Sequence, residues 1–347
     1  MSDKLLITID FPPNLGGVAR YLDTYARKHG LDVLCPQAVF QSSIFETEQI
    51  PVFRKKLLWG GWPKWLPLLF WSKIYSRKYK EITISHILPV GYFALLCGKP
   101  YILILHGLDI LNAGKTKWKK YWAKKVLDKA ERIVANSRAT GELLRTVFGD
   151  LYKYEVEYPL LAPIAKPYKN ARQELGLENK KIILSLGRLV KRKGQEKIIK
   201  LLPRILREEP SAIFVIAGDG EYKEKLEELV RELKLENKVI FLGKVPEKEL
   251  PNLYSGCDIF VLPAQPSKDN WEGFGMVCLE AAYFAKPCIV TNVGGLPEAV
   301  EDNATGFVVH DDEELGARII ELLKDENLRY ALGDEGRARV EEEFLIR

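Results

Sequence analysis

Two carboxylates flank a glycine-rich run near the end of the chain. Glu272 and Glu280 are separated by the seven residues Gly-Phe-Gly-Met-Val-Cys-Leu. A helix that begins near Phe274 would point its unpaired N–H groups and positive dipole end at an anion. This spacing suits a ligand with hydroxyls at both ends and a diphosphate between them, the sugar near Glu272 and a ribose near Glu280. A helix-start acid plus an unrelated surface acid would give the same spacing.

A second candidate is the run GRLVKRKG (residues 187–194), which holds four cations between an apolar run and a predicted helix. Cations this close repel one another unless an anion lies between them. Arg188 can fork onto two phosphate oxygens, and Lys193 can add a point charge. A solvated basic turn is the alternative.

The first half of the chain offers two weaker signals. Gly16 and Gly17 follow an apolar run and open a predicted helix, so the backbone there could approach an anionic ligand closely. No complete GxGxxG accompanies them, and no acidic residue is placed to mark a dinucleotide ribose. His106 follows the apolar run 101–105 and could face a cleft, or it could be a structural histidine.

Short apolar runs alternate with amphipathic stretches along the whole chain. Strands are predicted at 4–9, 31–34, 82–84, 101–105, 132–135, 182–186, 212–217, 238–242, 258–262 and 287–291. Helices are predicted at 17–29, 117–130, 194–207, 221–234, 247–255, 274–285 and near 313–323. Such alternation is typical of parallel α/β sheets, which bind ligands at the carboxyl ends of their strands.

A length of 347 residues favours two domains over one. We predict an N-terminal Rossmann-like acceptor-binding domain over residues 1–160. A linker without periodicity follows at 161–170, and a C-terminal Rossmann-like domain that binds a nucleotide sugar covers 171–347.

Charge divides unevenly between the halves. Residues 1–170 hold 26 Lys/Arg and 14 Asp/Glu, a net +12, whereas residues 171–347 hold 26 and 33, a net −7. Residues 53–80 contain eight Lys/Arg, no acid and four of the seven Trp, and residues 115–125 repeat this composition. Trp with Lys/Arg is typical of a membrane interface. We therefore expect an anionic membrane surface as a partner and no nucleic acid, since no nucleic-acid motif accompanies these residues.

Neither a targeting segment nor a spanning helix is evident. The N-terminus lacks the charged-then-apolar signal pattern, and no run approaches about 18 apolar residues. The predicted location is the cytoplasm, peripheral on the inner face of the membrane. Five scattered cysteines without a CxxC predict buried thiols in a reducing compartment, and neither a metal site nor a disulfide framework.

In order, the motifs GGVAR, HGLD, GRLVKRKG, AGDGE, EGFGMVCLE and VGGLPE resemble the retaining glycosyltransferases of family 4, over nearly the whole chain. The resemblance implies the GT-B fold, an α/β architecture of two Rossmann-like doubly wound domains with a cleft between them. It implies transfer of a hexosyl unit (mannose, glucose or N-acetylglucosamine) from a GDP- or UDP-sugar, with retention and with neither metal nor cofactor. The aromatic and basic segments at 53–80 and 115–125 in turn predict an acceptor that is lipid-linked or presented at a membrane, in glycolipid or polysaccharide synthesis.

The resemblance also implies roles for single residues. Arg188 and Lys193 would neutralise the diphosphate, Glu272 would bind sugar hydroxyls, and Glu280 would bind the ribose. His106 would lie beside the sugar.

Backbone contacts are implied for the remaining positions. Gly16 and Gly17 would approach the diphosphate from the first domain. Sugar and phosphate would meet the backbone of Phe274, Gly275, Met276 and Val277, and the base would lie near Gly243, Lys244 and Val245.

Two rival functions share this architecture. A sugar-nucleotide 2-epimerase would turn over a nucleotide sugar without an acceptor, and a non-catalytic membrane-bound scaffold would bind one without turnover. One departure concerns residues 343–347, which lie near where the family's C-terminal helix crosses back to the first domain, so we expect a shortened tether.

Overall fold

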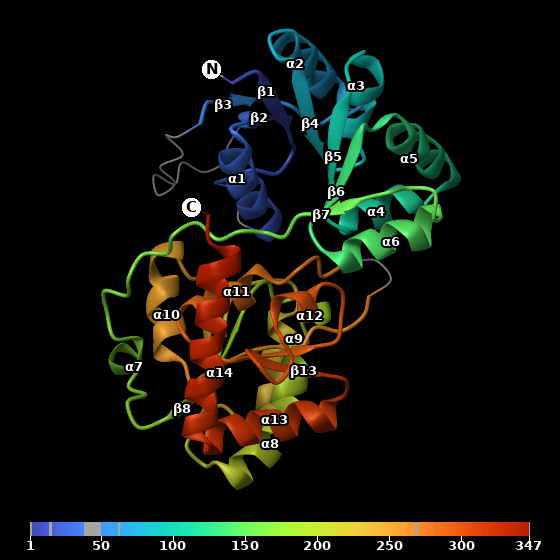
Figure 1. Ribbon diagram of the computed structural model, residues 1–347. Coiled ribbons are helices and arrows are strands. Elements are labelled where there is room, and N and C mark those ends of the chain that lie inside the picture. The colour runs from blue at the N-terminus through green and yellow to red at the C-terminus, as the bar shows by residue number, and fades with distance from the viewer. Residues whose placement is uncertain (1, 14–15, 38–49, 62, 268–269, 347) are drawn as a thin grey trace. The chain divides into compact units, whose positions relative to one another are not determined.

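The computed structural model describes residues 2–13, 16–37, 50–61, 63–267 and 270–346 (Figure 1). Internal contacts divide the chain into two compact units. Unit 1 comprises Met1–Leu161, Asp269–Phe274 and Ile346, and unit 2 comprises Ala162–Lys268, Gly275–Leu345 and Arg347. Among the helices in the described ranges, none has the length and apolar character needed to cross a bilayer.

Unit 1 contains a seven-stranded sheet in which every pairing is parallel (Figure 1). In spatial order the strands are β3 (Val52–Lys55), β2 (Asp32–Pro36), β1 (Lys4–Ile7), β4 (Glu81–Ser85), β5 (Tyr101–Leu105), β6 (Arg132–Ala135) and β7 (Glu155–Val156). The helices are α1 (Gly17–His29), α2 (Leu66–Ser76), α3 (Val90–Leu96), α4 (Leu108–Gly114), α5 (Lys117–Lys129) and α6 (Arg138–Phe148).

Side chains that alternate along each strand pack into two apolar clusters, one on each face of the sheet, because successive residues of a strand point to opposite faces. Leu6, Val33 and Ile102 pack with α1 in one cluster. Their neighbours Leu5 and Leu103 belong to the other cluster, with residues of α2 to α6. The near-continuous apolar strands follow from this two-sided burial.

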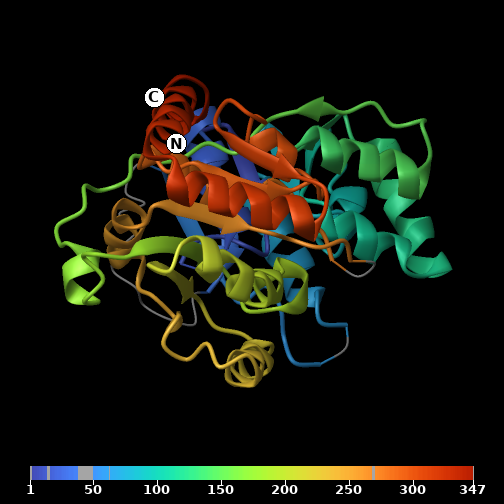
Figure 2. The ribbon, with the colours of Figure 1, turned by 90° about the horizontal axis from the view of Figure 1, so that it is seen from below.

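Unit 2 contains a six-stranded parallel sheet. In spatial order its strands are β10 (Val239–Gly243), β9 (Ala212–Ala217), β8 (Lys181–Leu186), β11 (Ile259–Leu262), β12 (Cys288–Thr291) and β13 (Gly306–Val309). The helices are α7 (Ala171–Glu174), α8 (Gln195–Glu208), α9 (Lys223–Glu232), α10 (Leu250–Gly256), α11 (Met276–Tyr283), α12 (Leu296–Ala299), α13 (Asp312–Lys324) and α14 (Glu326–Arg339). The red helices of Figures 1 and 2 are α13 and α14, which share the buried cluster of α8 and α9.

Two parallel α/β sheets confirm the predicted fold class. The prediction missed the edge strands β3, β7 and β13 and several helices, among them α2 and α14. In α2 the buried positions include Ser72 and Ser76, whereas Phe70 is 60% exposed. Its apolar residues therefore do not mark the buried face, and helical periodicity in the sequence is weak.

The predicted helix at 274–285 begins at Met276. Gly275 lies at φ 94, a left-handed conformation that caps the helix and favours glycine. Near the end of the chain, the backbone N–H of Ile346 donates to the carbonyl of Leu161 at 3.0 Å, and both residues belong to unit 1.

Candidate active site

Each sheet has one point at which the strand order reverses. In unit 1 it lies between β1 and β4, and in unit 2 between β8 and β11. Open α/β sheets bind ligands at the carboxyl ends of the strands at such a point. The chain leads from β1 to Gly16 and from β8 into the basic turn, so these two predicted site segments lie at the switch points, and β4 leads into His86.

The basic turn of unit 2 packs on the loop after β11 and forms hydrogen bonds with it. Gly194 lies at φ 74, and a Cβ added there would come within 1.9 Å of the carbonyl oxygen of Pro263. The backbone N–H of Gln265 donates to the carbonyl of Arg192 at 2.8 Å, and its side-chain amide donates to that of Lys191 at 2.6 Å. Glycine at position 194 thus lets the two loops of the switch point touch.

The AGDG turn after β9 packs on the same loop. Cβ atoms added at Gly218 and Gly220 would lie 1.9 and 2.3 Å from the carbonyl oxygens of Gly187 and Leu189, respectively. The N–H of Leu189 in turn donates to the carbonyl of Asp219 at 2.9 Å. These glycines are required by close backbone approach, and they hold the start of the basic turn in place.

The two cations chosen from the sequence differ in their surroundings. Arg188 is exposed, whereas Lys193 is only 8% exposed, and its Cε would lie 3.8 Å from a Cβ on Gly187. Burial strengthens the field of an ammonium group on a nearby anion. On β8 before the turn and directly after the turn, Ser185 Oγ and both amide atoms of Gln195 are buried and find no hydrogen-bond partner among the described residues. Unsatisfied polar atoms of this kind are typical of a ligand site.

Glu280 is buried, which excludes the alternative in which it is an unrelated acid on the surface. It is 3% exposed on α11, and one carboxylate oxygen accepts a hydrogen bond from the Tyr254 hydroxyl at 2.7 Å. Tyr254 packs in turn on Phe260 and Phe284. The carboxylate is thus oriented by a buried aromatic cluster, and its predicted contact with a ribose stays a prediction.

The three residues predicted to lie near the base are found at the carboxyl end of β10, the strand that pairs with β9. Gly243 ends that strand at φ 64, and its carbonyl accepts from the N–H of Gly218 at 2.8 Å. Lys244 is exposed and Val245 half-buried. They lie at the same carboxyl edge of the sheet as the basic turn, and their contact with a base stays a prediction.

In unit 1, Gly16 and Gly17 open helix α1. Both are exposed, and nothing lies within 4 Å of a Cβ added at Gly16. The carbonyl of Gly16 accepts from the N–H of Arg20, so the helix starts at this point with its first N–H groups directed outward. An anion could approach them closely.

His106 is the centre of a buried polar cluster at the other side of this switch point. It is 5% exposed, and its Nε2 lies 2.8 Å from the hydroxyl of Ser85, which also lies 3.0 Å from Nδ1 of His86. The Asp109 carboxylate accepts from the backbone N–H groups of His106 and Ile87, which joins the loops after β4 and β5. Burial, followed by the neighbouring His86, lowers the pKa of His106 well below 6.5, so its ring is neutral.

The loop that carries Glu272 belongs to unit 1 by its contacts. The Trp271 ring lies where a side chain on Gly107 would be, since an added Cβ would come within 2.0 Å of it, and its indole N–H donates to Thr140 at 3.3 Å. A Cβ on Gly273 would lie 3.0 Å from the carbonyl oxygen of His106. The residues on both sides of Glu272 therefore touch the loop of His106, and the chain enters unit 2 at Gly275.

Sequence reasoning missed three members of the unit 1 cluster: Ser85, His86 and Asp109. The dipeptide Ser-His directly after the apolar run 82–84 was a usable signal, because it stands at the carboxyl end of a strand. Among the residues that the structure describes, no group of three or more His, Cys, Asp or Glu side chains is placed to hold a metal ion.

Family models match both parts of the chain. Residues 15–156 match "Glycosyltransferase Family 4" and residues 168–339 match "Glycosyl transferases group 1". The chain therefore belongs to the group 1 glycosyltransferases and is an enzyme that transfers a glycosyl unit, as the resemblance predicted.

Curated relatives are similar over nearly their whole length. The GDP-mannose-dependent monoacylated alpha-(1-6)-phosphatidylinositol monomannoside mannosyltransferase of Corynebacterium glutamicum is 29% identical, over 98% of this chain and 93% of the relative. A GDP-mannose-dependent alpha-(1-6)-phosphatidylinositol monomannoside mannosyltransferase of Mycolicibacterium smegmatis is 27% identical, over 96% and 92%.

Solved structures share the fold. The Anabaena protein HepE, in complex with UDP and glucose, superposes with a TM-score of 0.81 at 22% identity and covers 99% of this chain and 95% of its own. Sucrose-phosphate synthase from Thermosynechococcus elongatus gives 0.82 at 21% identity, with the same coverage.

Proposed function

We propose that this glycosyltransferase moves mannose from GDP-mannose to a lipid-linked acceptor at a membrane surface, with retention at the anomeric carbon. Mannose and guanosine are chosen among the hexoses and bases that the sequence left open because the two relatives described above are both named as GDP-mannose-dependent. Phosphatidylinositol monomannoside, which both names contain, is the first acceptor to test.

The observation that carries the proposal is the basic turn at the unit 2 switch point. It presents the buried ammonium of Lys193 and the exposed guanidinium of Arg188 beside unsatisfied buried polar atoms. A departing nucleoside diphosphate develops negative charge, and cations fixed beforehand stabilise it without reorganisation. In unit 1 the neutral ring of His106 suits sugar hydroxyls, which form hydrogen bonds with uncharged groups.

In the proposed step the bond from the anomeric carbon to the diphosphate oxygen breaks, and the acceptor hydroxyl bonds to the same face of the sugar. The hydroxyl proton passes to the departing phosphate oxygen, so no protein base is required. Arg188 and Lys193 hold the leaving diphosphate, and Glu272 and Glu280 orient the sugar and ribose. Neither a metal nor an organic cofactor takes part in this scheme, which predicts full activity in the presence of EDTA.

The test pairs nucleotide binding with transfer. GDP is expected to raise the melting temperature at concentrations where UDP and ADP do not, because a ligand that binds only the folded state stabilises it. Radiolabelled GDP-mannose is then expected to label a lipid extract only when the acceptor is supplied, and the product is expected to be alpha-linked. Turnover of the donor without acceptor would point to an epimerase, and binding without turnover to a scaffold.

An outward-facing apolar stripe on α2 supports the membrane part of the proposal. Leu66, Phe70 and Ile74 are 46%, 60% and 39% exposed, and their spacing of four places them on one side of the helix. Exposed Lys73 and Arg77 border this stripe. A helix that turns apolar residues outward between cations is typical of one lying at a lipid interface.

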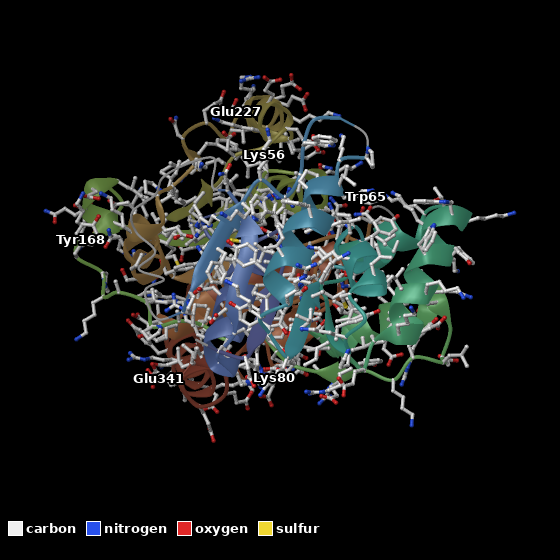
Figure 3. The ribbon with its side chains drawn as sticks, turned by 90° about the horizontal axis from the view of Figure 1, so that it is seen from above. Lys56, Trp65, Lys80, Tyr168, Glu227 and Glu341 are labelled. Atoms are coloured by element: carbon white, nitrogen blue, oxygen red, sulfur yellow. The ribbon has the colours of Figure 1, made fainter. Side chains whose placement is uncertain are left out.

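Aromatic rings connect this stripe to α5. Tyr92 of α3 packs on Trp65 with ring centroids 4.9 Å apart and on Trp118 and Trp122 of α5 at 6.1 and 6.2 Å. Trp118 is 59% exposed. Lys56 and Trp65, from the segment between β3 and α2, can be followed in Figure 3. The two basic segments chosen from the sequence thus form one surface of unit 1, here called the aromatic–basic surface.

Vesicle sedimentation tests this surface. Replacing Lys55, Lys56, Lys64 and Lys73 with Glu is expected to abolish binding to phosphatidylserine vesicles, because each Lys near an anionic surface contributes roughly 1 kcal/mol. The matched control replaces four exposed lysines of unit 2: Lys200, Lys225, Lys234 and Lys248. Undiminished sedimentation of the first variant, or an equal loss in the control, would contradict a role for this surface.

A further inference from the structure

Ser85, His86 and His106 form a hydrogen-bonded chain of three side chains. The Ser85 hydroxyl oxygen lies 2.8 Å from Nε2 of His106 and 3.0 Å from Nδ1 of His86, and the two imidazole centroids are 5.0 Å apart. Ser85 is fully buried. His86 lies at φ 77, a left-handed conformation that is uncommon outside glycine and that occurs at functional sites where surrounding structure enforces it.

Because the Ser85 hydroxyl carries a single proton, the two hydrogen bonds of this chain must run in the same direction. Ser85 can donate to one imidazole nitrogen only, so the other must donate to Ser85 if both contacts are to be hydrogen bonds. His106 is neutral because of its burial and therefore holds one ring proton, on either Nε2 or Nδ1. Its Nδ1 is buried and has no hydrogen-bond partner among the described residues.

The two possible orders give Nδ1 of His106 opposite character. When Nδ1 of His86 carries a proton, it donates to Ser85, Ser85 donates to Nε2 of His106, and the proton of His106 lies on Nδ1. When Nδ1 of His86 accepts, both bonds reverse, and Nδ1 of His106 offers a lone pair. A charged His86 carries protons on both nitrogens and permits only the first order.

We propose that Ser85 is a positioning residue that couples the tautomers of the two histidines, so that protonation of His86 makes Nδ1 of His106 a hydrogen-bond donor. The functional part of this inference rests on the hexosyl transfer proposed above, in which His106 lies beside the transferred sugar. A sugar hydroxyl would then meet a donor or an acceptor according to the state of a residue that need not touch it.

Two titratable groups from neighbouring helices pack on this chain of side chains. From α4, Asp109 faces the pair and binds the backbone N–H groups of His106 and Ile87. From α1, the Tyr21 ring lies edge-on to His106 at 5.7 Å, and burial raises the pKa of Tyr21 well above 10, so it stays neutral. His86 itself is half-buried.

Nitrogen-15 NMR of the histidine rings in the full chain, without any nucleotide, tests the coupling directly. In the wild type, Nδ1 of His106 is expected to change from the unprotonated to the protonated type as pH falls through the titration of His86. In Ser85→Ala the state of His106 is expected to stop following His86, while Ser85→Thr, which keeps the hydroxyl, restores the link. Ser72→Ala, another buried serine of unit 1, is the matched control.

A second variant tests the coupling if substitution of Ser85 prevents folding. His86→Asn retains a residue that adopts positive φ but does not titrate, so His106 is expected to hold one state at every pH. The coupling is overturned if Nδ1 of His106 keeps a single state through the titration of His86 in the wild type, or if Ser85→Ala follows His86 as the wild type does.

Activity separates the coupling from the proposed function. The pH profile of kcat/KM is expected to show a limb at the titration of His86, and Ser85→Ala is expected to flatten it and to lower kcat/KM about tenfold. A chain that couples by NMR but shows no such limb overturns the role in transfer. A chain with no transfer to any acceptor overturns the proposed function, and the NMR result still decides the coupling.

Discussion

The two units present candidate sites of opposite character at the switch points of their parallel sheets. At the unit 2 switch point the backbone is drawn together by Gly194, Gly218 and Gly220, and the side chains presented are cations. At the unit 1 switch point Ser85 and His106 are buried and His106 is neutral, and the Ser85 hydroxyl contacts both His106 and His86. A charged site suits the diphosphate end of a nucleotide sugar, and a neutral one suits the hydroxyls of the sugar.

The two halves of the chain also differ in net charge. The first 170 residues carry a net charge of +12 and the remainder −7. Unit 1 exposes the aromatic–basic surface, whereas unit 2 places its cations of interest in a glycine-bounded turn. In the proposed function, cations therefore serve two purposes: attraction to an extended anionic surface in unit 1, and stabilisation of a single anionic group in unit 2.

Removal of the buried cation from unit 2 is expected to have the largest effect. Lys193→Ala should lower kcat by about 10²–10³, because a fixed charge on the departing diphosphate is lost, and should change the binding of the sugar less. Lys191→Ala, an exposed cation in the same turn, is the control. Steady-state kinetics with GDP-mannose measures both, and unchanged turnover in Lys193→Ala would remove this residue from the site.

Packing of the unit 2 turn is the next test. Gly194→Ala would place a Cβ within 1.9 Å of a backbone oxygen at φ 74, and we expect it to destabilise the fold by about 3 kcal/mol. Gly176→Ala has a similar φ of 65 but open space around the new Cβ, and should cost only about 1 kcal/mol. Urea unfolding of both variants measures the difference, and equal losses would show that backbone conformation matters and close approach does not.

In unit 1 the contact between two loops is made by a tryptophan ring, whereas in unit 2 it depends on a glycine. Trp271→Ala would remove the ring that packs on Gly107 and donates to Thr140, and we expect a loss of about 2 kcal/mol, since Trp271 is only half-buried. Hydrogen exchange should accelerate at the described amides of residues 270–274. Trp59→Ala, at a tryptophan that is 44% exposed, should leave these amides unchanged.

The smallest effect concerns an ion pair of unit 1. Burial raises the pKa of Glu157, but hydrogen bonds from His29 and Lys28 outweigh it, so the pKa lies below its ordinary 4.5. Its stabilisation is therefore present above pH 4.5 and is lost as pH falls through the lowered pKa. Glu157→Gln should cost about 1 kcal/mol at neutral pH and little in acid, whereas the exposed Glu131→Gln should cost little at either. Unfolding at both pH values decides this.

Several features followed from the sequence alone. Apolar runs alternating with amphipathic stretches predicted two parallel α/β sheets, because strands buried on both faces must be apolar throughout. The run GRLVKRKG, the pair Glu272 and Glu280, and the aromatic and basic residues at 53–80 were also evident, since charge, spacing and composition are local properties. The class of enzyme came from the resemblance of the ordered motifs to a known glycosyltransferase family.

The tertiary structure decided what depends on contacts between distant residues. It placed Ser85 between His86 and His106, buried Glu280 against Tyr254, and assigned the loop of Glu272 to unit 1. The outward apolar stripe of α2 was equally hidden, because only packing shows which face of a helix is covered. Local patterns fix which residues can do chemistry, whereas the order in which strands meet in a sheet fixes which of them come together.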